Sequence, residues 1–359
     1  MSVEDMLERA PYGDEYEKKQ NILLGRINEL TRYHYGHCAE YQQMIDALHD
    51  GRTEYEKLSD VPFLPVQIFK KMELKSVPDI DVFKVMTSSG TTGQQVSKIF
   101  LDRETANNQQ KVLTKIVSDY TGKTRMPMII LDCPSVLKNR SMFSARGAGI
   151  LGFSLFGSKK IYAFDDNMEL NLDEMKEFLK KYEGQTIFLF GFTYMIWQYF
   201  YKKLKESGEY IPLEHGVLIH GGGWKKLVKE AVSKEEFKAG LKEVCGITSV
   251  HDYYGMVEQT GCIYMECEYG HLHASLFSDI IIRNMKDFSV CREGEKGAVQ
   301  VISALPESYP GHSILTEDMG CVLGEDDCPC GRKGKYFSIY GRMKNAEVRG
   351  CSDTFERIR

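Results

Sequence analysis

The sequence has no excess of positive charge. Its 359 residues include 46 lysines and arginines against 51 aspartates and glutamates, which gives a formal net charge of −5. A chain of this charge lacks the positive field that concentrates nucleic acid or anionic membranes around a protein. We therefore expect no polyanionic partner.

Long apolar runs and a leader segment are also absent. No stretch reaches the roughly 18 uninterrupted apolar residues of a membrane-spanning helix, and the N-terminal MSVEDMLERA is acidic where a signal peptide is first basic and then apolar. We expect a cytoplasmic protein without a membrane span. In that setting the ten cysteines, which are unevenly spaced, favour reduced thiols in metal-binding or catalytic roles over a disulfide framework.

The sequence does contain an alternation of strand and helix patterns. From Met126 onward, short apolar runs alternate with amphipathic segments. Because strands that are joined by crossover helices run parallel, we expect an α/β protein with a parallel sheet. Ser233 and Glu236 have the spacing of a capping box at the start of one helix, and Gly246 follows its end. The expected strands cover residues 128–132, 160–164, 186–192, 216–221 and 249–255, and the expected helices cover residues 173–182, 194–205 and 233–244.

Two other regions flank this alternation. Apolar residues between Asp14 and Leu48 recur at spacings of three and four, which predicts a helical N-terminal part over residues 1–85. After about Glu266, short strands with glycine-rich turns predict a small β-rich part over residues 266–340. The expected organisation is one large domain (1–340) that contains both parts, followed by a hinge and tail (341–359).

A run of glycine and hydroxyl residues precedes Lys98. Glycines let a backbone turn approach a polyphosphate closely, hydroxyls supply uncharged donors, and the lysine adds a positive charge. The spacing is not that of a Walker loop, and without further context such a run could also be an ordinary flexible loop. The residues of this candidate phosphate loop are Ser88, Ser89, Gly90, Thr91, Thr92 and Gly93.

The loop resembles the phosphate loop of the adenylate-forming superfamily, which includes acyl-CoA synthetases and luciferases. This resemblance implies a domain that uses ATP and Mg²⁺ to activate a carboxylic acid as an acyl-AMP. Matches to several segments in the order of the superfamily argue against coincidence. The further matching segments are Gly221-Gly222-Gly223-Trp224, Tyr254-Gly255-Met256-Val257-Glu258, Thr316-Glu317-Asp318 and Gly341-Arg342.

The resemblance implies roles on the adenine side of the nucleotide. Tyr254, which is followed by Gly255, would lie against the adenine. Gly222 and Gly223 would form the glycine-rich turn that contacts the same base.

It also implies roles for charged residues. Glu258 would hold magnesium, Asp318 would hold the ribose hydroxyls, Arg342 would reach the nucleotide, and Lys344 would be the hinge residue. Taken singly, Glu258 could also be a solvated charge and Asp318 the cap of a turn.

Members of the superfamily typically continue past the hinge with a mobile domain of about 100 residues, whose lysine assists adenylation. This sequence ends soon after Arg342. We expect the mobile domain to be reduced to a short tail, with Lys98 or another basic residue supplying the cationic help.

The tail contains Arg349-Gly350-Cys351-Ser352. This ending, together with SARGAGILGFSLFG at residues 144–157 and HGGGWK at residues 220–225, resembles the acyl-protein synthetase (LuxE) family of bacterial luminescence systems. The resemblance implies that a fatty acid is adenylated, that the acyl group passes to Cys351 as a thioester, and that a reductase protein collects it. A thiolate attacks a mixed anhydride readily, and the neighbouring arginine would favour the thiolate.

Three alternatives stay open. Cys351 could be a buried small apolar residue. The chain could be a synthetase like phenylacetate-CoA ligase, with free CoA as the acceptor. It could also be a catalytically silent scaffold that binds nucleotide and stabilises a reductase complex.

A second set of cysteines indicates a metal site. Cys267 and His273 lie close in sequence, and Cys328-Pro329-Cys330 places two thiols on one tight turn. Structural Zn²⁺ requires four tetrahedral nitrogen or sulfur ligands, which two such pairs would supply. The phenylacetate-CoA ligase-like group resembles this sequence in both segments, and the likeness implies zinc. Free buried thiols are the alternative reading, and His271 or Cys262 could replace one of the four ligands.

Overall fold

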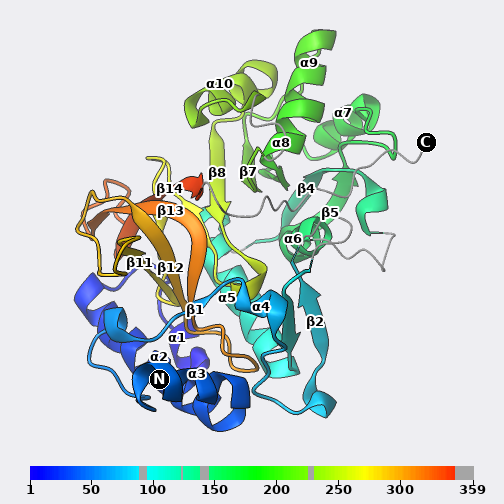
Figure 1. Ribbon diagram of the computed structural model, residues 1–359. Helices are drawn as coiled ribbons and strands as arrows, with labels where there is room; N and C mark the ends of the chain where they lie inside the picture. Colours follow the sequence, from blue (N-terminus) through cyan, green and yellow to red (C-terminus); the bar gives the residue numbers. More distant parts are fainter. Residues whose placement is uncertain (89–94, 123, 138–144, 225–229, 344–359) are drawn as a thin grey trace. The chain divides into compact units, whose positions relative to one another are not determined.

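The computed structural model describes residues 1–88, 95–122, 124–137, 145–224 and 230–343 (Figure 1). The described chain divides into two compact units. The first, which we call the β-rich unit, comprises residues 1–88, 95–119 and 255–343. The second, which we call the parallel-sheet unit, comprises the described part of residues 120–254.

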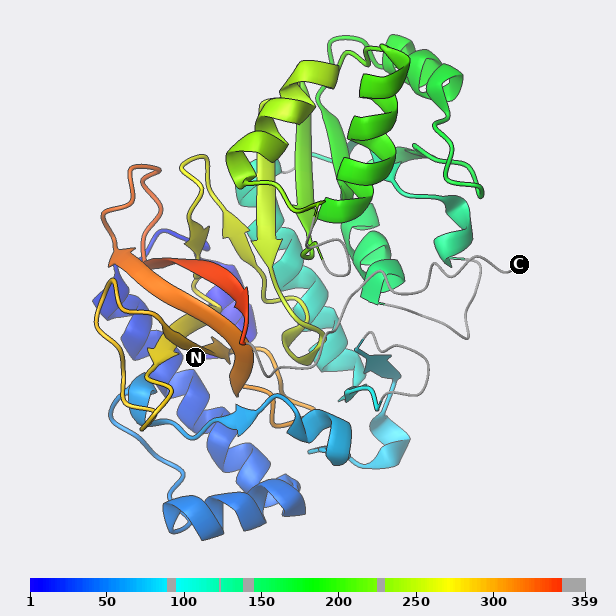
Figure 2. The same ribbon diagram turned by 45° about the horizontal axis from the view of Figure 1, so that its top comes forward.

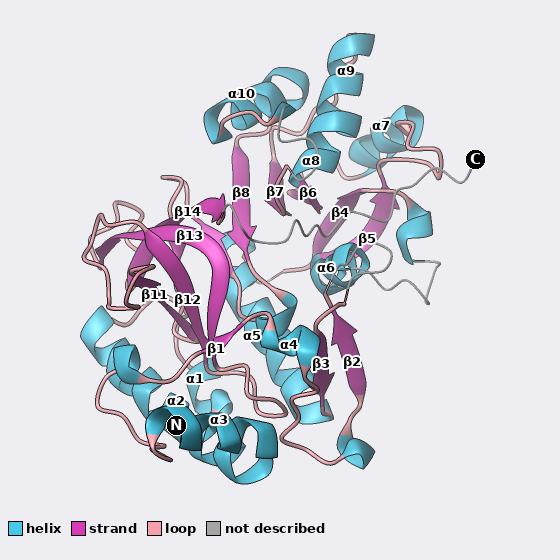
Figure 3. Cartoon of the chain, viewed as in Figure 1, coloured by secondary structure: helices cyan, strands magenta, loops and turns pink. Residues whose placement is uncertain are grey.

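The parallel-sheet unit is built on strands in the order β8-β7-β6-β4-β5, and every pairing among them is parallel. All residues of β4 and β6 are buried, as expected for strands covered on both faces. Helices α6, α7, α9 and α10 surround these strands (Figure 3). The strands are β4 (Met126–Leu131), β5 (Gly157–Tyr162), β6 (Ile187–Phe192), β7 (Gly216–Gly221) and β8 (Ser249–Tyr254), and the helices are α6 (Ala145–Phe153), α7 (Leu172–Lys181), α8 (Thr193–Met195), α9 (Lys202–Ser207) and α10 (Lys234–Cys245).

These elements confirm the predicted α/β class and overlap every strand and helix expected between residues 126 and 255. Ser233 accepts the backbone N–H of Glu236 at 3.1 Å, so it caps α10 as predicted. Gly246 ends the helix with a φ of 70°, a left-handed conformation that suits glycine. The helix predicted over 194–205 contains one π-helical stretch, Ile196–Tyr201.

The β-rich unit contains an antiparallel sheet in the order β11-β12-β13-β14-β10-β9, with β1 parallel to β13. The sheet is strongly twisted, with α2 beside it (Figure 2). A separate hairpin pairs β2 with β3. The strands are β1 (Leu64–Pro65), β2 (Lys84–Thr87), β3 (Lys98–Leu101), β9 (Tyr264–Glu266), β10 (Leu272–His273), β11 (Ser278–Arg283), β12 (Gly297–Ser303), β13 (Ser313–Glu325) and β14 (Lys335–Arg342), and the helices are α1 (Val3–Leu7), α2 (Tyr16–His37), α3 (Ala39–His49), α4 (Ile68–Lys71) and α5 (Arg103–Thr121).

The helical N-terminal part is shorter than predicted. The expected helix over residues 14–48 is divided at Cys38, which has an extended backbone with a φ of −127°. After α3, residues 50–83 hold short helical turns, α4 and the two-residue strand β1. Helix α5 and strand β13 were not predicted.

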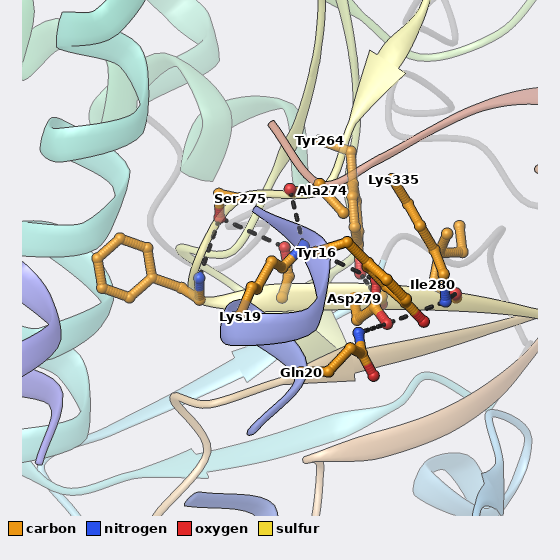
Figure 4. Close-up of polar contacts among 12 residues, drawn as sticks. Tyr16, Lys19, Gln20, Tyr264, Ala274, Ser275, Asp279, Ile280 and Lys335 are labelled. Atoms are coloured by element: carbon orange, nitrogen blue, oxygen red, sulfur yellow. Dashed lines mark hydrogen bonds and ion pairs between the residues drawn. The ribbon is translucent and has the colours of Figure 1, made fainter. Parts of the chain in front are cut away.

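A buried ionic cluster fastens α2 to the β-rich sheet (Figure 4). Lys335 donates to Asp279 Oδ2 at 3.1 Å and to the carbonyl of Ile280 at 2.9 Å. Lys19 on α2 donates to the carbonyl of Ala274 at 2.9 Å, and its Nζ lies 3.8 Å from Asp279 Oδ1. Because all three charged side chains are buried, replacement of Asp279 by an uncharged residue would leave two buried ammonium groups without this counter-charge.

Two buried histidines pack at the other end of α2. His34 bonds through Nδ1 to the Ser76 hydroxyl at 2.7 Å and through Nε2 to the carbonyl of Pro306 at 3.0 Å. The His312 ring stacks on it at 5.1 Å, and its Nε2 lies 3.1 Å from the Thr31 hydroxyl. Burial lowers the pKa of His34 well below its ordinary value and lowers that of His312 to about 3.

These histidines predict a loss of stability in acid. The unfolded chain takes up protons near pH 6.5, whereas the folded chain resists protonation down to about pH 3 at His312, so stability falls as the pH drops through this window. We expect about 2 kcal/mol less free energy of unfolding per imidazole at pH 5 than at pH 7. Urea unfolding at both pH values measures it. His312→Gln should show a shallower pH dependence than the parent, and an equally steep one would contradict the assignment.

Candidate functional site

The glycine-rich turn lies at the carboxyl end of β7, the edge where open α/β sheets bind ligands. A Cβ on Gly221 would overlap the ring of Tyr253 on β8, so the ring fills the space above this glycine. Gly222 follows with a φ of 79°, which a residue with a side chain rarely adopts. The register pairs Gly221 with Tyr253, so the turn at Gly222 and Gly223 lies at the same sheet edge as Tyr254. The structure therefore brings together two segments that the sequence had assigned to the adenine.

Hydrogen bonds and ion pairs among polar side chains stabilise this edge of the sheet. Thr193, at the end of β6, lies 2.9 Å from His220 Nδ1 and donates to the carbonyl of Gly221 at 3.3 Å. Asp252 lies 3.8 Å from the same nitrogen. Arg146 of α6 forms a two-pronged ion pair with Asp132, which directly follows β4, and both side chains are buried. These contacts join residues distant in sequence, and no sequence pattern signals them.

In the β-rich unit, two predicted nucleotide residues face each other across strands. Asp318 on β13 pairs in register with Arg342 on β14, and Arg342 Nε lies 3.9 Å from Asp318 Oδ1. The buried Thr316 hydroxyl accepts the Asp318 backbone N–H at 3.1 Å and donates to the carbonyl of Val299 at 2.8 Å. The register of the two strands thus places the Asp318 carboxylate beside the Arg342 guanidinium.

Glu258 lies in the short turn Val257–Gln259, and only 3% of its surface is exposed. Tyr309 donates to its carbonyl at 2.8 Å, and Gln259 donates to the carbonyl of Gly311 at 2.9 Å. A buried carboxylate needs compensation from donors or a cation. The solvated-charge reading of Glu258 is therefore wrong.

The stem of the predicted phosphate loop is described, and its tip is not. Ser88 donates its N–H to the Ser97 carbonyl at 3.1 Å, and Ser97 returns its N–H to the Ser88 hydroxyl at 2.9 Å. Lys98 begins β3 and pairs with Glu73 at 2.8 Å, with both side chains about half exposed. The tip of the phosphate loop, the hinge residue and the acyl acceptor lie outside the described residues, so their roles stay predictions. These residues are Ser89, Gly90, Thr91, Thr92, Gly93, Lys344 and Cys351.

The four predicted metal ligands converge in the β-rich unit. The ligand atoms of Cys267, His273, Cys328 and Cys330 all lie within 4.8 Å of one another. Strand β10 holds His273 between β9 and β14. The turn at residues 328–331 is closed by a Gly331 N–H bond to the Cys328 carbonyl at 2.9 Å.

Two of the distances between these atoms are close to those expected around a tetrahedral ion. Zn–S bonds of about 2.3 Å and Zn–N bonds of about 2.0 Å place two sulfurs about 3.8 Å apart and a sulfur and a nitrogen about 3.5 Å apart. The Cys267 and Cys328 sulfurs are 3.9 Å apart, and Cys330 Sγ is 3.4 Å from His273 Nε2. The donor set and its spacing therefore fit zinc.

The shifted pKa values of Cys267, His273 and Cys328 also fit a metal. Burial raises the pKa of the Cys328 thiol to about 12 and raises that of Cys267. Burial lowers the pKa of His273 to about 3, so its imidazole is neutral, as a ligand must be. Buried thiolates are unfavourable without a cation, and a metal would supply it.

The two alternative ligands lie outside the group of four. His271 precedes β10, and its Nδ1 lies 3.3 Å from Cys328 Sγ, where it can donate a hydrogen bond to a bound thiolate. Cys262 donates to the carbonyl of Phe277 at 3.3 Å.

Solved structures of similar fold belong to adenylate-forming ligases. A 2-hydroxyisobutyryl-CoA ligase in the postadenylation state superposes with a TM-score of 0.68 at 16% identity, over 94% of this chain and 70% of that one. The same ligase in an open conformation gives 0.67 at 15% identity, over 90% and 69%. The fold is that of adenylate-forming ligases.

Sequence comparison assigns the family. The model of the family "Acyl-protein synthetase, LuxE" matches residues 2–358. A long-chain-fatty-acid–luciferin-component ligase of Vibrio harveyi is 25% identical over 343 residues, which are 93% of this chain and 88% of the relative. One of the same description from Photorhabdus luminescens is 30% identical over 78 residues, 22% of this chain and 66% of the relative. The chain belongs to the acyl-protein synthetase (LuxE) family.

Within the described part of the chain, no helix is both long enough and apolar enough to cross a membrane.

Proposed function

We propose that this protein activates a fatty acid with ATP and transfers the acyl group to its own Cys351, from which a reductase protein collects it. The observation that carries the proposal is the family match over residues 2–358. The name of the Vibrio harveyi relative specifies a long-chain fatty acid, which supports the substrate class.

In the first half-reaction, a carboxylate oxygen attacks the α-phosphorus of ATP, and pyrophosphate leaves as the bond to the β-phosphate breaks. Asp318 would accept the ribose hydroxyls, with Arg342 beside it toward the nucleotide. Tyr254 and the turn at Gly222 and Gly223 would hold the adenine. Positioning and charge neutralisation of this kind lower the barrier without covalent participation by the enzyme.

The phosphates require positive charge and donors. The loop from Ser88 to Gly93 would supply backbone and hydroxyl donors, and Lys98 would supply a positive charge after leaving Glu73. Glu258 would hold Mg²⁺, which neutralises phosphate charge when bound. The likeness of residues 254–258 to the corresponding segment of the superfamily supports this role.

In the second half-reaction, the Cys351 thiolate attacks the acyl carbonyl and AMP leaves, so the product is a thioester. The CoA ligases of similar fold, one of them solved with CoA, make free CoA the rival acceptor. Incubation with ATP, Mg²⁺, a mixture of fatty acids and CoA separates the two. We expect acyl-protein with or without CoA. Acyl-CoA as the sole product would refute self-acylation.

We further propose that Cys267, His273, Cys328 and Cys330 bind structural Zn²⁺. Four protein ligands leave no open position, which is typical of a structural site. Two observations support this assignment: the four ligand atoms lie within 4.8 Å of one another, and two of their distances, 3.9 and 3.4 Å, are close to tetrahedral values.

Asp318→Asn should slow adenylation. The amide keeps the shape of the side chain but loses the charge that would bind the ribose hydroxyls and pair with Arg342. Loss of a charge-assisted hydrogen bond corresponds to a fall of about 10- to 100-fold in kcat/KM for ATP. Acid-dependent pyrophosphate exchange measures the rate, and Asp81→Asn at an exposed position is the matched control. Equal exchange rates for both variants would show that Asp318 does not bind the nucleotide.

A further inference from the structure

Helix α2 depends on a distant residue for its N-terminal cap. Its own N-cap residue, Glu15, makes no side-chain hydrogen bond to the described helix. Instead, the Tyr16 N–H donates to the carboxylate oxygens of Asp326 at 2.9 and 3.2 Å. The first N–H groups of a helix need acceptors, and a carboxylate there is further favoured by the helix dipole.

Asp326 belongs to the same loop as two of the metal ligands. This loop, residues 326–334, joins β13 to β14 and contains Cys328 and Cys330. The Asp326 carboxylate also accepts the Gly334 N–H at 2.7 Å, and the Asp326 N–H donates to the Gly334 carbonyl at 3.1 Å. The group that caps α2 is therefore held by both ends of the loop that carries the thiols.

Fixing the backbone of this loop in its observed conformation costs free energy. Asp326 has a φ of 62°, and Gly331 and Gly334 have φ values of 81° and 87°. A side-chain-bearing residue rarely adopts this conformation, and glycines lose much conformational entropy when fixed. A metal bound by Cys328 and Cys330 would restrict the loop to the conformation that presents Asp326.

Further contacts join the N-terminal segment, residues 12–20, to the metal ligands and their neighbours. The Lys333 N–H donates to the carbonyl of Tyr12 at 3.0 Å. The Tyr12 ring lies edge-on to the ligand His273 at 6.2 Å, and Arg332 lies over the same ring at 5.7 Å. Lys19 extends the contact to the Ala274 carbonyl, next to His273. Tyr12 and Lys19, at the two ends of the segment 12–19, thus contact the 326–334 loop and the residues around His273.

From these contacts we infer that the metal centre is a clasp for the N-terminal segment: metal binding fixes the 326–334 loop, and the loop holds residues 12–20 and the start of α2 through Asp326. The inference rests on the metal proposed above. A zinc ion that stabilised only its own surroundings would not affect the docking of a distant segment. According to this inference, metal occupancy controls the docking of residues 12–20.

Hydrogen exchange with mass spectrometry tests the clasp on the full chain. The metal is removed with 1,10-phenanthroline, the non-chelating 1,7 isomer is the control, and metal content is measured on each sample. We expect amides of residues 16–20 to exchange at least about tenfold faster after metal loss, while amides of α7 in the other unit keep their rates. Asp326→Asn keeps a side chain that tolerates a left-handed backbone, and it should speed exchange in the same peptide about fivefold, the size of one lost cap, with metal retained.

The outcomes separate the clasp from the metal itself. Protein that carries no metal when purified without chelator overturns both proposals. Metal loss that leaves exchange in residues 16–20 unchanged, or speeds it equally in both units, overturns the clasp and leaves the metal site standing. The clasp also fails if Asp326→Asn leaves exchange unchanged.

Discussion

Cys351→Ser should abolish the covalent acyl-protein and leave adenylation intact. A serine hydroxyl is far less nucleophilic than a thiolate at neutral pH, whereas the residues proposed to bind ATP are unchanged by the substitution. After incubation with ATP, Mg²⁺ and fatty acid, intact-protein mass spectrometry should detect the acyl adduct on the parent and essentially none on the variant. Pyrophosphate exchange should keep its rate within about twofold.

Cys291→Ser is the matched control, because Cys291 is a partly exposed thiol of the β-rich unit. That variant should acylate like the parent. Acyl adduct on Cys351→Ser at the level of the parent would show that another residue accepts the acyl group.

Cys328→Ser should remove the metal and much of the stability of the β-rich unit. A serine hydroxyl is a poor zinc ligand, and the three remaining ligands are buried or half-buried. Because structural metal binding contributes directly to folding, we expect the free energy of unfolding to fall by on the order of 3 to 5 kcal/mol. Metal content should fall below half an equivalent, and denaturant unfolding measures the stability.

Cys245→Ser is the control for loss of a buried thiol. Cys245 is buried in α10 of the other unit and donates to the carbonyl of Leu241 at 3.0 Å. Its replacement should leave the metal content unchanged and cost less stability. A parent protein with less than half an equivalent of zinc, purified without chelator, would refute the metal site.

Strands β4, β6 and β7 were predictable because each is a short, mostly apolar run bounded by polar segments. Helix α5 and strand β13 lack such a signal. On α5, Thr105, Asn108 and Gln109 are buried together with three apolar residues, so the inner face is polar in the first two turns and apolar only further along the helix. Strand β13 carries Glu317 and Asp318 in its centre, which interrupt the apolar pattern of a strand.

The candidate site was predicted as separate motifs, and only the fold shows which motifs meet. Sequence order assigned Asp318 and Arg342 to one nucleotide, and the β13–β14 register places them side by side. The sequence predicted His273 as a metal ligand and, because of strand alternation, left His271 as a possible replacement. The strand begins after His271, so alternation does not constrain that residue, and its imidazole faces Cys328 from outside the group.

The two compact units could not be read from the sequence. The β-rich unit takes residues from both sides of the parallel-sheet unit, and local patterns carry no information about such long-range association. The predicted domain over residues 1–340 stays a prediction.

The central claim is that this protein activates a carboxylic acid by adenylation. Acid-dependent exchange of radiolabelled pyrophosphate into ATP tests it most directly, because exchange requires a reversibly formed acyl-AMP and no acyl acceptor. We expect exchange that depends on both a fatty acid and Mg²⁺, and that falls in Asp318→Asn. Retained ATP binding without acid-dependent exchange, over a range of fatty and aromatic acids, would contradict the account and favour a nucleotide-binding scaffold.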